Sequence, residues 1–360
     1  MSYLPEDTQR NRVSKKWRFA VVGAGFIGEV HSLAIKQIPE AELAVVVDVS
    51  ETRAKALAEK YNTEWMTNWL EAIARDDVDI VNVCTPNGTH MDIAVGAARH
   101  GKHVMVEKPM EVTLERIDAI IQACLENNVV LGCIFPTRTR KGVIETKKAV
   151  DAGRLGRLTL CDAYVKWHRP QEYYDTGGWK GIWQLDGGGA MMNQSIHSVD
   201  LLQYLAGPVK SIYAHTGTLA HRMETEDTAV ALLAFEHGAF GVIEGSTAAW
   251  PGFPSRVELC GDRGTIVLED GRITGWKLAD STDEEEKSML SLEGMEGSGA
   301  SDPMGIGCAG HVRQINDLID AVKNGRPPLV DGLEGRKAVE IICGIYESQR
   351  LGRLVRLPFA

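Results

Sequence analysis

The sequence predicts an α/β protein: a doubly wound parallel sheet at the N-terminus, followed by an α+β domain with a large, mostly antiparallel sheet. First, short β-branched runs alternate with helical stretches from residue 17 to about 135, the pattern of a parallel sheet. Second, beyond residue 157 the β-branched runs follow one another across short turns, as in an antiparallel sheet. Third, a chain of 360 residues is long enough for two domains.

The first domain is predicted to span residues 17–136, after a loose leader at 1–16. Its leader contains both acidic and basic residues and has no apolar core of the kind found in signal peptides. Apolar periodicity predicts strands at 19–22, 43–47, 78–84, 103–106 and 129–134, with helices such as 51–61, 91–100 and 114–127 between them.

The second domain is predicted to span residues 137–360, beginning with a helix at 142–152. Strands are expected at 157–164, 209–216, 228–235, 239–248, 256–260 and 264–268. The segment 280–310 is acidic and then rich in Gly and Ser, which indicates a mobile excursion; a functional lid is the less favoured alternative. Amphipathic helices at 311–324 and 333–351 are expected to close the chain.

Composition excludes several classes of partner. A net charge of −10 leaves no basic face for nucleic acid, and no apolar run approaches the roughly 18 residues of a membrane span. Seven scattered cysteines without CxxC spacing argue against zinc and against a disulfide framework. We therefore expect no metal, no nucleic acid, no membrane partner, and reduced thiols in a cytoplasmic protein.

A glycine-rich turn follows the first predicted strand, and an acidic residue closes the second. Gly23-Ala24-Gly25-Phe26-Ile27-Gly28 has the GxGxxG spacing, and Asp48 lies twenty positions beyond Gly28, where a carboxylate binds the ribose of a dinucleotide. A carboxylate repels a 2′-phosphate, so NAD is favoured; Arg53 leaves NADP as the alternative. The predicted cofactor-binding residues here are Gly23, Gly25, Phe26, Ile27, Gly28, Asp48 and Arg53.

Polar residues follow two later strands of the same predicted sheet, at the edge where ligands bind in doubly wound folds. After the third strand come Thr85, Pro86, Asn87 and His90, and after the fourth come Glu107 and Lys108. These residues are expected to border the cofactor, and a lysine emerging from a buried strand suits proton transfer or binding of a substrate hydroxyl. The alternatives are a proline turn that caps a helix and a solvated Glu–Lys pair.

A third group of candidate residues lies in the second domain. Gly187-Gly188-Gly189 precedes a predicted helix on which Asn193 and His197, four positions apart, share one face. A histidine that titrates near neutrality is the expected base for a hydroxyl proton. Asp200 is placed to orient the imidazole or to cap another group, and a purely structural histidine remains the alternative.

An aromatic and polar tract supplies candidate substrate contacts, because sugar rings stack on aromatic side chains and their hydroxyls need polar partners. Trp183 and Tyr174 are equally explained by packing at an interface. The predicted substrate-binding residues are Lys108, Arg138, Lys166, Trp167, Arg169, Trp179, Asn193, His197 and His311.

These motifs together resemble the glucose–fructose oxidoreductase, inositol dehydrogenase and rhizopine-catabolism family, Gfo/Idh/MocA. The resemblance covers nearly the whole chain and rests on the glycine turn at 23–28, Thr85-Pro86-Asn87-Gly88-Thr89-His90, Glu107-Lys108-Pro109, Gly187-Gly188-Gly189 with His197, and the closing segment 330–338. It implies a Rossmann domain, and a C-terminal sheet whose open face forms a homodimer or homotetramer.

The resemblance also implies roles for individual residues. Lys108 matches the family's catalytic lysine, often followed by a cis bond to proline, and His197 matches its acid–base histidine. Many members have aspartate where this chain has Asn193, and an amide cannot take the proton. The proton role therefore falls on His197 and Lys108, with Asn193 as a further catalytic-site residue.

The function implied is NAD-dependent interconversion of a secondary alcohol and a ketone on a sugar, glycoside or cyclitol. Position 3 of a glucose-like ring is one candidate for the oxidised carbon. Three alternatives stay open: a nucleotide-sugar or deoxysugar 3-dehydrogenase, a redox-neutral glycosidase that retains NAD, and a non-catalytic regulatory binder.

Overall fold

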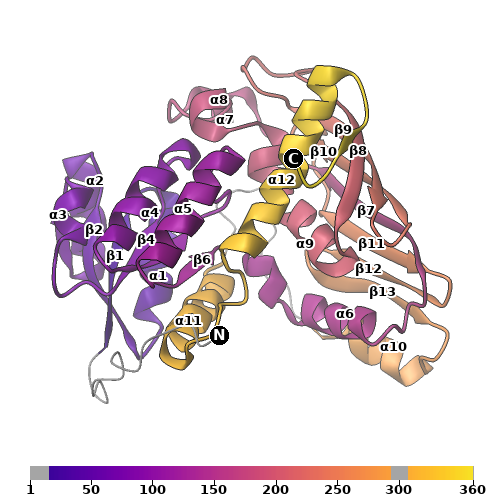
Figure 1. The fold of residues 1–360 in the computed structure, drawn as a ribbon, viewed down its shortest axis with the longest axis horizontal. Coiled ribbons are helices and arrows are strands. Elements are labelled where there is room, and N and C mark those ends of the chain that lie inside the picture. Colours follow the sequence, from indigo (N-terminus) through magenta and orange to yellow (C-terminus); the bar gives the residue numbers. More distant parts are fainter. Residues whose placement is uncertain (1–15, 293–306, 360) are drawn as a thin grey trace. The chain divides into compact units, whose positions relative to one another are not determined.

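The computed structural model describes residues 16–292 and 307–359, which divide into two compact units (Figure 1). Unit 1 contains residues 16–134 and 307–336, and unit 2 contains residues 135–292 and 337–359. The predicted leader lies almost entirely outside the described residues, as do positions 293–306 of the predicted excursion.

Unit 1 is built on a six-stranded parallel sheet in the order β3-β2-β1-β4-β5-β6. The strand order reverses between β1 and β4, which creates the crevice where such folds bind ligands. Its elements are β1 (Trp17–Val22), α1 (Phe26–Lys36), β2 (Ala41–Val47), α2 (Glu51–Tyr61), β3 (Glu64–Met66), α3 (Trp69–Ile73), β4 (Ile80–Val83), η2 (Asn87–Thr89), α4 (His90–Arg99), β5 (His103–Val106), α5 (Leu114–Glu126), β6 (Leu131–Cys133) and α11 (Ala309–Asn324).

The central strands of unit 1 are apolar on both faces, as expected for strands covered by helices on each side. All four residues of β4 are buried. Helix α11 packs against α1, and its Ile315, Leu318 and Ile319 join the core that contains Phe19. The sequence-based division at residue 136 had assigned α11 to the second domain, because chain order does not reveal that its apolar face completes the core of unit 1.

Unit 2 is built on an eight-stranded sheet in the order β13-β12-β11-β7-β10-β9-β8-β14. Every neighbouring pair is antiparallel except β7 and β10. Its elements are η3 (Pro136–Thr139), α6 (Lys141–Asp151), β7 (Leu158–Lys166), α7 (Gln171–Asp175), α8 (Trp183–Asp186), the π-helical η4 (Ala190–Ser195), α9 (Ile196–Ala206), β8 (Val209–Gly217), β9 (Thr228–Phe235), β10 (Phe240–Ser246), β11 (Arg256–Gly261), β12 (Gly264–Glu269), β13 (Arg272–Leu278), α10 (Asp283–Leu290) and β14 (Val355–Arg356). Helix α12 (Gly332–Leu351) begins in unit 1 and continues into unit 2. The predicted fold class is thus confirmed.

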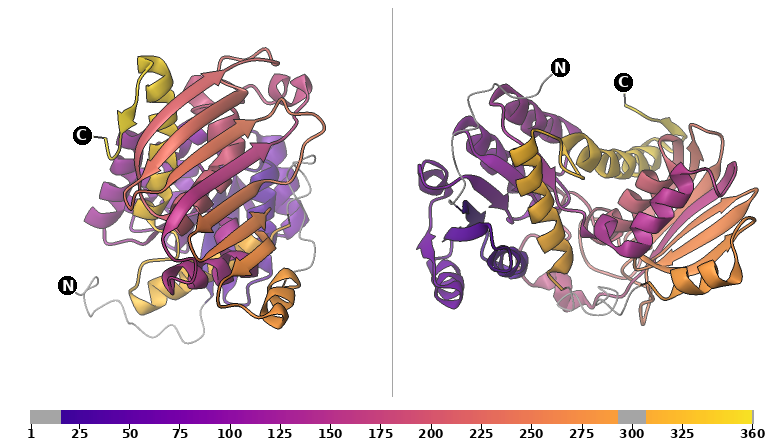
Figure 2. Two further views of the ribbon diagram at one scale, coloured as in Figure 1. Left: turned by 90° about the vertical axis from the view of Figure 1, so that its right-hand side faces the viewer. Right: turned by 90° about the horizontal axis from the view of Figure 1, so that it is seen from below.

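The two faces of the large sheet differ. Alternate residues of β7, β9 and β10 are buried, and α9 and η4 pack on that side. The other residues of these strands lie on the opposite face, which is turned toward the viewer in the left panel of Figure 2. We call this second side the open face; it carries exposed apolar side chains at Leu160, Tyr213, Val230, Leu232 and Phe240.

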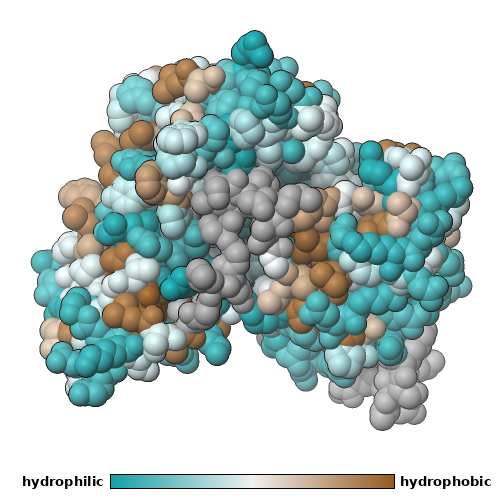
Figure 3. Space-filling model, turned by 180° about the vertical axis from the view of Figure 1, so that it is seen from behind, coloured by the Kyte–Doolittle hydropathy of each residue, from teal (hydrophilic) through white to brown (hydrophobic). Residues whose placement is uncertain are grey.

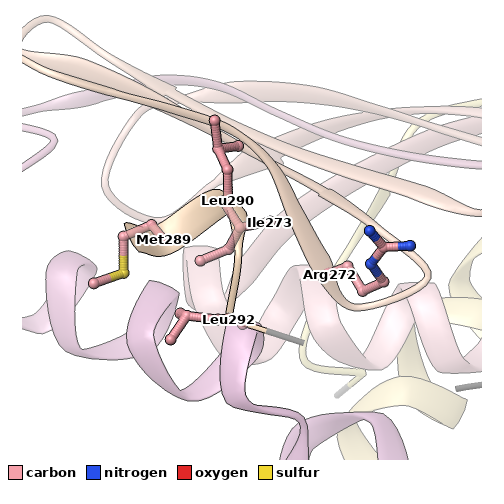
Figure 4. Close-up of a pocket in the computed structure, with 6 residues that line it drawn as sticks. Arg272, Ile273, Met289, Leu290 and Leu292 are labelled. Atoms are coloured by element: carbon pink, nitrogen blue, oxygen red, sulfur yellow. The ribbon is translucent and has the colours of Figure 1, made fainter. Parts of the chain in front are cut away.

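The elements missed by the sequence analysis include β3, β13, β14 and α10. The prediction of an irregular excursion at 280–310 is wrong for 283–290, because Thr282 caps a helix whose acidic first turn complements the helix dipole. Helix α10 packs on β13, and a small pocket between them and α6 is lined by Gly142, Arg272, Ile273, Met289, Leu290 and Leu292 (Figure 4). None of the predicted site residues lines this pocket.

Hydrophobic and hydrophilic residues are intermingled on the surface seen in Figure 3, so exposure alone does not single out an interaction surface. Among the residues the structure describes, no helix is both long enough and apolar enough to cross a membrane.

Candidate active site

The glycine turn between β1 and α1 forms a cradle for a dinucleotide. A Cβ on Gly23 would lie 2.3 Å from the carbonyl oxygen of Cys84, and one on Gly28 would lie 1.8 Å from that of Gly23. At Gly25, by contrast, a Cβ would meet nothing within 4 Å. The turn is therefore tight at its two ends and open at the N-terminus of α1, where the phosphates of a dinucleotide bind. Phe26 and Ile27 are partly exposed in the first turn of α1.

Asp48 follows β2 and faces this turn. Its carboxylate accepts hydrogen bonds from the Ala24 N–H at 2.9 Å and the Ser50 N–H at 2.8 Å, and it pairs with Arg53 Nη2 at 2.7 Å. Burial opposes the charge, but Arg53 and the backbone donors outweigh burial, and they hold the pKa of Asp48 below its usual value. An ionised carboxylate is thus kept where a ribose would need an acceptor.

His90 contacts the backbone of the loop after β4 from inside the protein, so its side chain does not lie on the surface of that loop. His90 is fully buried, with Nε2 2.8 Å from the Thr85 carbonyl oxygen and Nδ1 3.0 Å from that of Pro109. Both ring nitrogens are therefore occupied by backbone. Pro86 precedes the short helix η2, in which Asn87 is buried, and the Thr89 hydroxyl donates to Thr85 Oγ1 at 2.8 Å.

Lys108 follows β5, and its peptide bond to Pro109 is cis. The preceding Glu107 is buried, and its Oε1 lies 2.9 Å from His31 Nε2 and 3.4 Å from His311 Nε2. His311, a predicted substrate contact, is itself buried in unit 1 beside Glu107. The carboxylate of Glu107 is thus turned into the interior of unit 1.

Asn193 and His197 are the accessible side chains of an otherwise buried segment. All residues from Asp186 to Gln203 are buried except these two, which are partly buried. Two partly exposed polar residues on an otherwise buried helical segment are what a site for a small polar substrate requires. Phe135 contacts the His197 ring edge-on at a centroid distance of 6.0 Å.

The glycine triplet before η4 is fixed by its surroundings. A Cβ on Gly188 would lie 2.1 Å from Tyr346 Oη, and one on Gly189 would lie 1.8 Å from the carbonyl oxygen of Glu226. The buried Glu226 carboxylate accepts from the N–H groups of Gly189 at 3.0 Å and Met191 at 2.8 Å. Burial raises the pKa of Glu226 despite these donors. The start of η4 therefore has little freedom.

Asp186 is a residue that the sequence analysis missed. It is buried, its Oδ1 accepts from Asn193 Nδ2 at 2.9 Å, and its Oδ2 accepts from the Gly181 N–H at 2.8 Å. The spacing of seven positions across the glycine triplet gave no signal, because helical periodicity does not run through a turn. A carboxyl group, absent from position 193, is thus present one hydrogen bond away.

The predicted substrate residues of unit 2 fall into two groups. Arg169 is buried, with its guanidinium 5.1 Å from the Trp167 ring centroid and 5.6 Å from that of Tyr173. The ammonium of Lys180, next to Trp179, lies 3.7 Å from the Tyr173 centroid, and Gln194 Nε2 donates to the Tyr173 hydroxyl at 3.2 Å. We call Arg169, Tyr173 and Lys180 the cationic cluster. Burial lowers the pKa of Lys180.

The structure does not bring Lys166 and Arg138 into that group. Lys166 lies on the open face and pairs with Glu244 at 2.8 Å, on the side opposite η4 and α9. Arg138 is fully buried and binds both oxygens of Asp200 at 2.6 and 2.8 Å. Asp200, which is expected to orient the imidazole or to cap another group, forms this ion pair with Arg138.

Comparisons with known proteins agree with this geometry. Residues 17–135 match the model of an oxidoreductase family with an NAD-binding Rossmann fold, and residues 143–267 match a GFO/IDH/MocA C-terminal domain. The chain is 29% identical to myo-inositol 2-dehydrogenase of Thermotoga maritima, over 94% of this chain and 98% of the relative. It is 27% identical to D-glucoside 3-dehydrogenase of Escherichia coli, over 96% and 98%. The crystal structure of the WlbA dehydrogenase from Bordetella pertussis, in complex with NADH and UDP-GlcNAcA, is similar with a TM-score of 0.86. It is 34% identical, over 96% of this chain and all of that one.

Proposed function

Because this chain belongs to the GFO/IDH/MocA family of NAD-binding oxidoreductases, we propose that it interconverts a secondary alcohol and a ketone on a sugar or cyclitol. The observation that carries the proposal is the accessible pair Asn193 and His197 on an otherwise buried segment. The relatives named as inositol and glucoside dehydrogenases support this substrate class.

The glycine turn and Asp48 hold the cofactor. Gly23, Gly25 and Gly28 let the backbone approach the phosphates, and Asp48 accepts from the ribose hydroxyls. The alternative, NADP, would require Arg53 to leave Asp48 and meet a 2′-phosphate. Bound NAD supplies the hydride acceptor for the alcohol carbon.

His197 acts as the base that accepts the hydroxyl proton. An imidazole has its ordinary pKa near neutrality and both takes and returns a proton. Lys108 binds the same oxygen and stabilises its developing negative charge, because a preorganised cation is most effective in a site from which water is excluded. Asn193, held by Asp186, fixes a substrate hydroxyl without exchanging its own proton.

A nucleotide sugar is a second candidate substrate, and the cationic cluster favours it. Arg169 and Lys180 place two positive charges around Tyr173 in a protein of net charge −10. Such a cluster suits a phosphate or a sugar carboxylate. The similarity to a dehydrogenase in complex with UDP-GlcNAcA points the same way.

The protein is a homo-oligomer joined through the open face of the large sheet. Leu232 and Phe240 are 57% and 65% exposed on adjacent hairpin strands, and side chains of this size gathered on one sheet face favour association. All seven cysteines are free, which supports a cytoplasmic location.

The test is incubation of the purified protein with NAD or NADP and a panel of inositols, hexoses, glucosides and UDP-sugars, following absorbance of the reduced cofactor. Reduction with one substrate class supports the dehydrogenase. Tight retention of NAD without net reduction would instead indicate the redox-neutral glycosidase when glycosides are cleaved, and a regulatory binder when they are not.

A further inference from the structure

Three ionisable side chains meet inside unit 1 at the end of β5. Glu107, His31 and His311 are all buried, and their ligand-capable atoms lie within 4.8 Å of one another. His31 comes from α1 and His311 from α11, and their rings meet edge to face at 5.1 Å. We call these residues the His–Glu–His cluster.

Hydrogen bonds define the roles within the cluster. The Asn82 amide donates from Nδ2 to His31 Nδ1 at 2.8 Å, so Nδ1 is the acceptor and the ring proton lies on Nε2. His31 Nε2 then donates to Glu107 Oε1 at 2.9 Å. His311 Nε2 approaches the same oxygen at 3.4 Å. Nε2 atoms of two imidazoles thus face one carboxylate oxygen.

The second carboxylate oxygen holds the backbone of the proposed catalytic lysine. Glu107 Oε2 accepts from the Lys108 N–H at 3.0 Å. On the other side of Lys108, His90 contacts the carbonyl oxygens of Pro109 at 3.0 Å and Met110 at 3.2 Å. The main chain is therefore held immediately before and after Lys108.

We propose that Glu107 is a positioning residue for Lys108, fixed by His31 and His311, and not the cofactor ligand that its place after β5 suggests. This inference rests on the proposed role of Lys108. A reacting group displaced by about 1 Å can lose on the order of 100-fold in rate, so a small shift of this backbone would be felt in the chemical step.

A metal ion is the competing explanation for two histidines and a carboxylate. The Nε2 atoms of both histidines and Oε1 of Glu107 are already joined to one another, and Oε2 is joined to Lys108. These contacts engage the Glu107 carboxylate and the Nε2 atom of each histidine without a cation, and the experiment includes metal analysis to separate the two explanations.

The test compares Glu107→Gln, His311→Leu and His311→Gln in the full-length protein. Glutamine at 107 cannot accept from both imidazoles and the Lys108 N–H. We expect kcat at saturating NAD and sugar to fall about 10- to 100-fold, with the Kd for NAD changed by less than about threefold. His311→Leu should give a smaller loss of kcat, and His311→Gln should restore it, because the glutamine amide also supplies a donor.

Gln314→Ala is the matched control, since Gln314 lies one turn from His311 on the buried side of α11 and donates to the Cys133 carbonyl oxygen. It should leave kcat unchanged. The proposal is overturned by a folded Glu107→Gln with wild-type kcat, by a loss confined to NAD affinity, or by stoichiometric zinc in the wild type. If the wild-type protein does not reduce NAD with any of the substrates tested, the proposed function itself is wrong.

Discussion

The Asn193 side-chain amide donates from Nδ2 to Oδ1 of the buried Asp186 at 2.9 Å. Asp186 also accepts from the Gly181 N–H, so one carboxylate fixes both the amide and the loop that leads into Lys180. The orientation of Asn193 is thereby set by a group that is itself buried.

Substitution Asp186→Asn should reduce kcat/KM about 10- to 100-fold, equivalent to roughly 1.4 to 2.7 kcal/mol. Asparagine has one acceptor oxygen for the two donors that Asp186 satisfies, so the Asn193 amide would lose its fixed orientation. Steady-state kinetics on the best sugar substrate measure the loss. Asp175→Asn, at an exposed carboxylate of α7, is the control and should leave kcat/KM unchanged. Equal kinetics for the two variants would count against the role of Asp186.

Substitution Asp48→Ser should shift cofactor preference toward NADP. Removing the carboxylate removes its repulsion of a 2′-phosphate and releases Arg53, which now pairs with Asp48 at 2.7 Å. We expect the ratio of kcat/KM for NADP to that for NAD to rise by at least about tenfold. Adding Arg53→Ala should reverse much of this gain, and a double variant as good with NADP as the single one would show that Arg53 plays no part.

A charge introduced on the open face should weaken the proposed association of subunits. Leu232→Glu is expected to shift the oligomer toward smaller species, because a carboxylate in an apolar interface lacks a partner. Light scattering coupled to size-exclusion chromatography measures the mass. Leu125→Glu, on α5 of unit 1 with a similar exposure of 55%, is the control. A wild-type mass for Leu232→Glu would show that the open face does not mediate association.

The free energy of unfolding should fall on mild acidification, because the pKa of His31 is lowered in the folded protein. Burial lowers the pKa of His31 below 6.5 in the folded protein, so below that pH the unfolded chain takes up a proton that the folded protein does not. The free energy of unfolding therefore decreases from pH 6.5 toward the folded-state pKa, by at most about 1.4 kcal/mol per pH unit for one group. Urea unfolding at pH 7.5 and 5.5 should show a larger loss for the wild type than for His31→Gln, which has nothing to titrate there. Equal losses would show that folding does not lower the pKa of His31.

Local patterns in the sequence predicted most of the fold. β-branched runs and apolar periodicity predicted the strands and several helices of unit 1, since these signals depend on neighbours along the chain. The membership of α11 in unit 1 depends on contacts of Ile315 and Leu318 with residues some 300 positions away, and no local pattern contains that information.

For the candidate site too, local patterns could be read from the sequence and long-range contacts could not. The glycine turn, Asp48 and the Asn193–His197 pair were predicted from fixed spacings along the chain. Asp186 was missed because it meets Asn193 across a turn. Lys166 was placed with the substrate residues from its sequence neighbours, but strand alternation turns it to the open face.

The most direct test of the central claim is the rate of NADH formation by the wild type, His197→Ala and Lys108→Met at saturating NAD and the best sugar or cyclitol, with the Kd for NAD measured on the same samples. Our prediction is that the wild type reduces NAD, and that each variant loses about 100- to 10,000-fold in kcat while binding NAD with near-wild-type affinity. Wild-type kcat in either variant, or a wild type that holds NAD yet forms no NADH with any substrate, would contradict it.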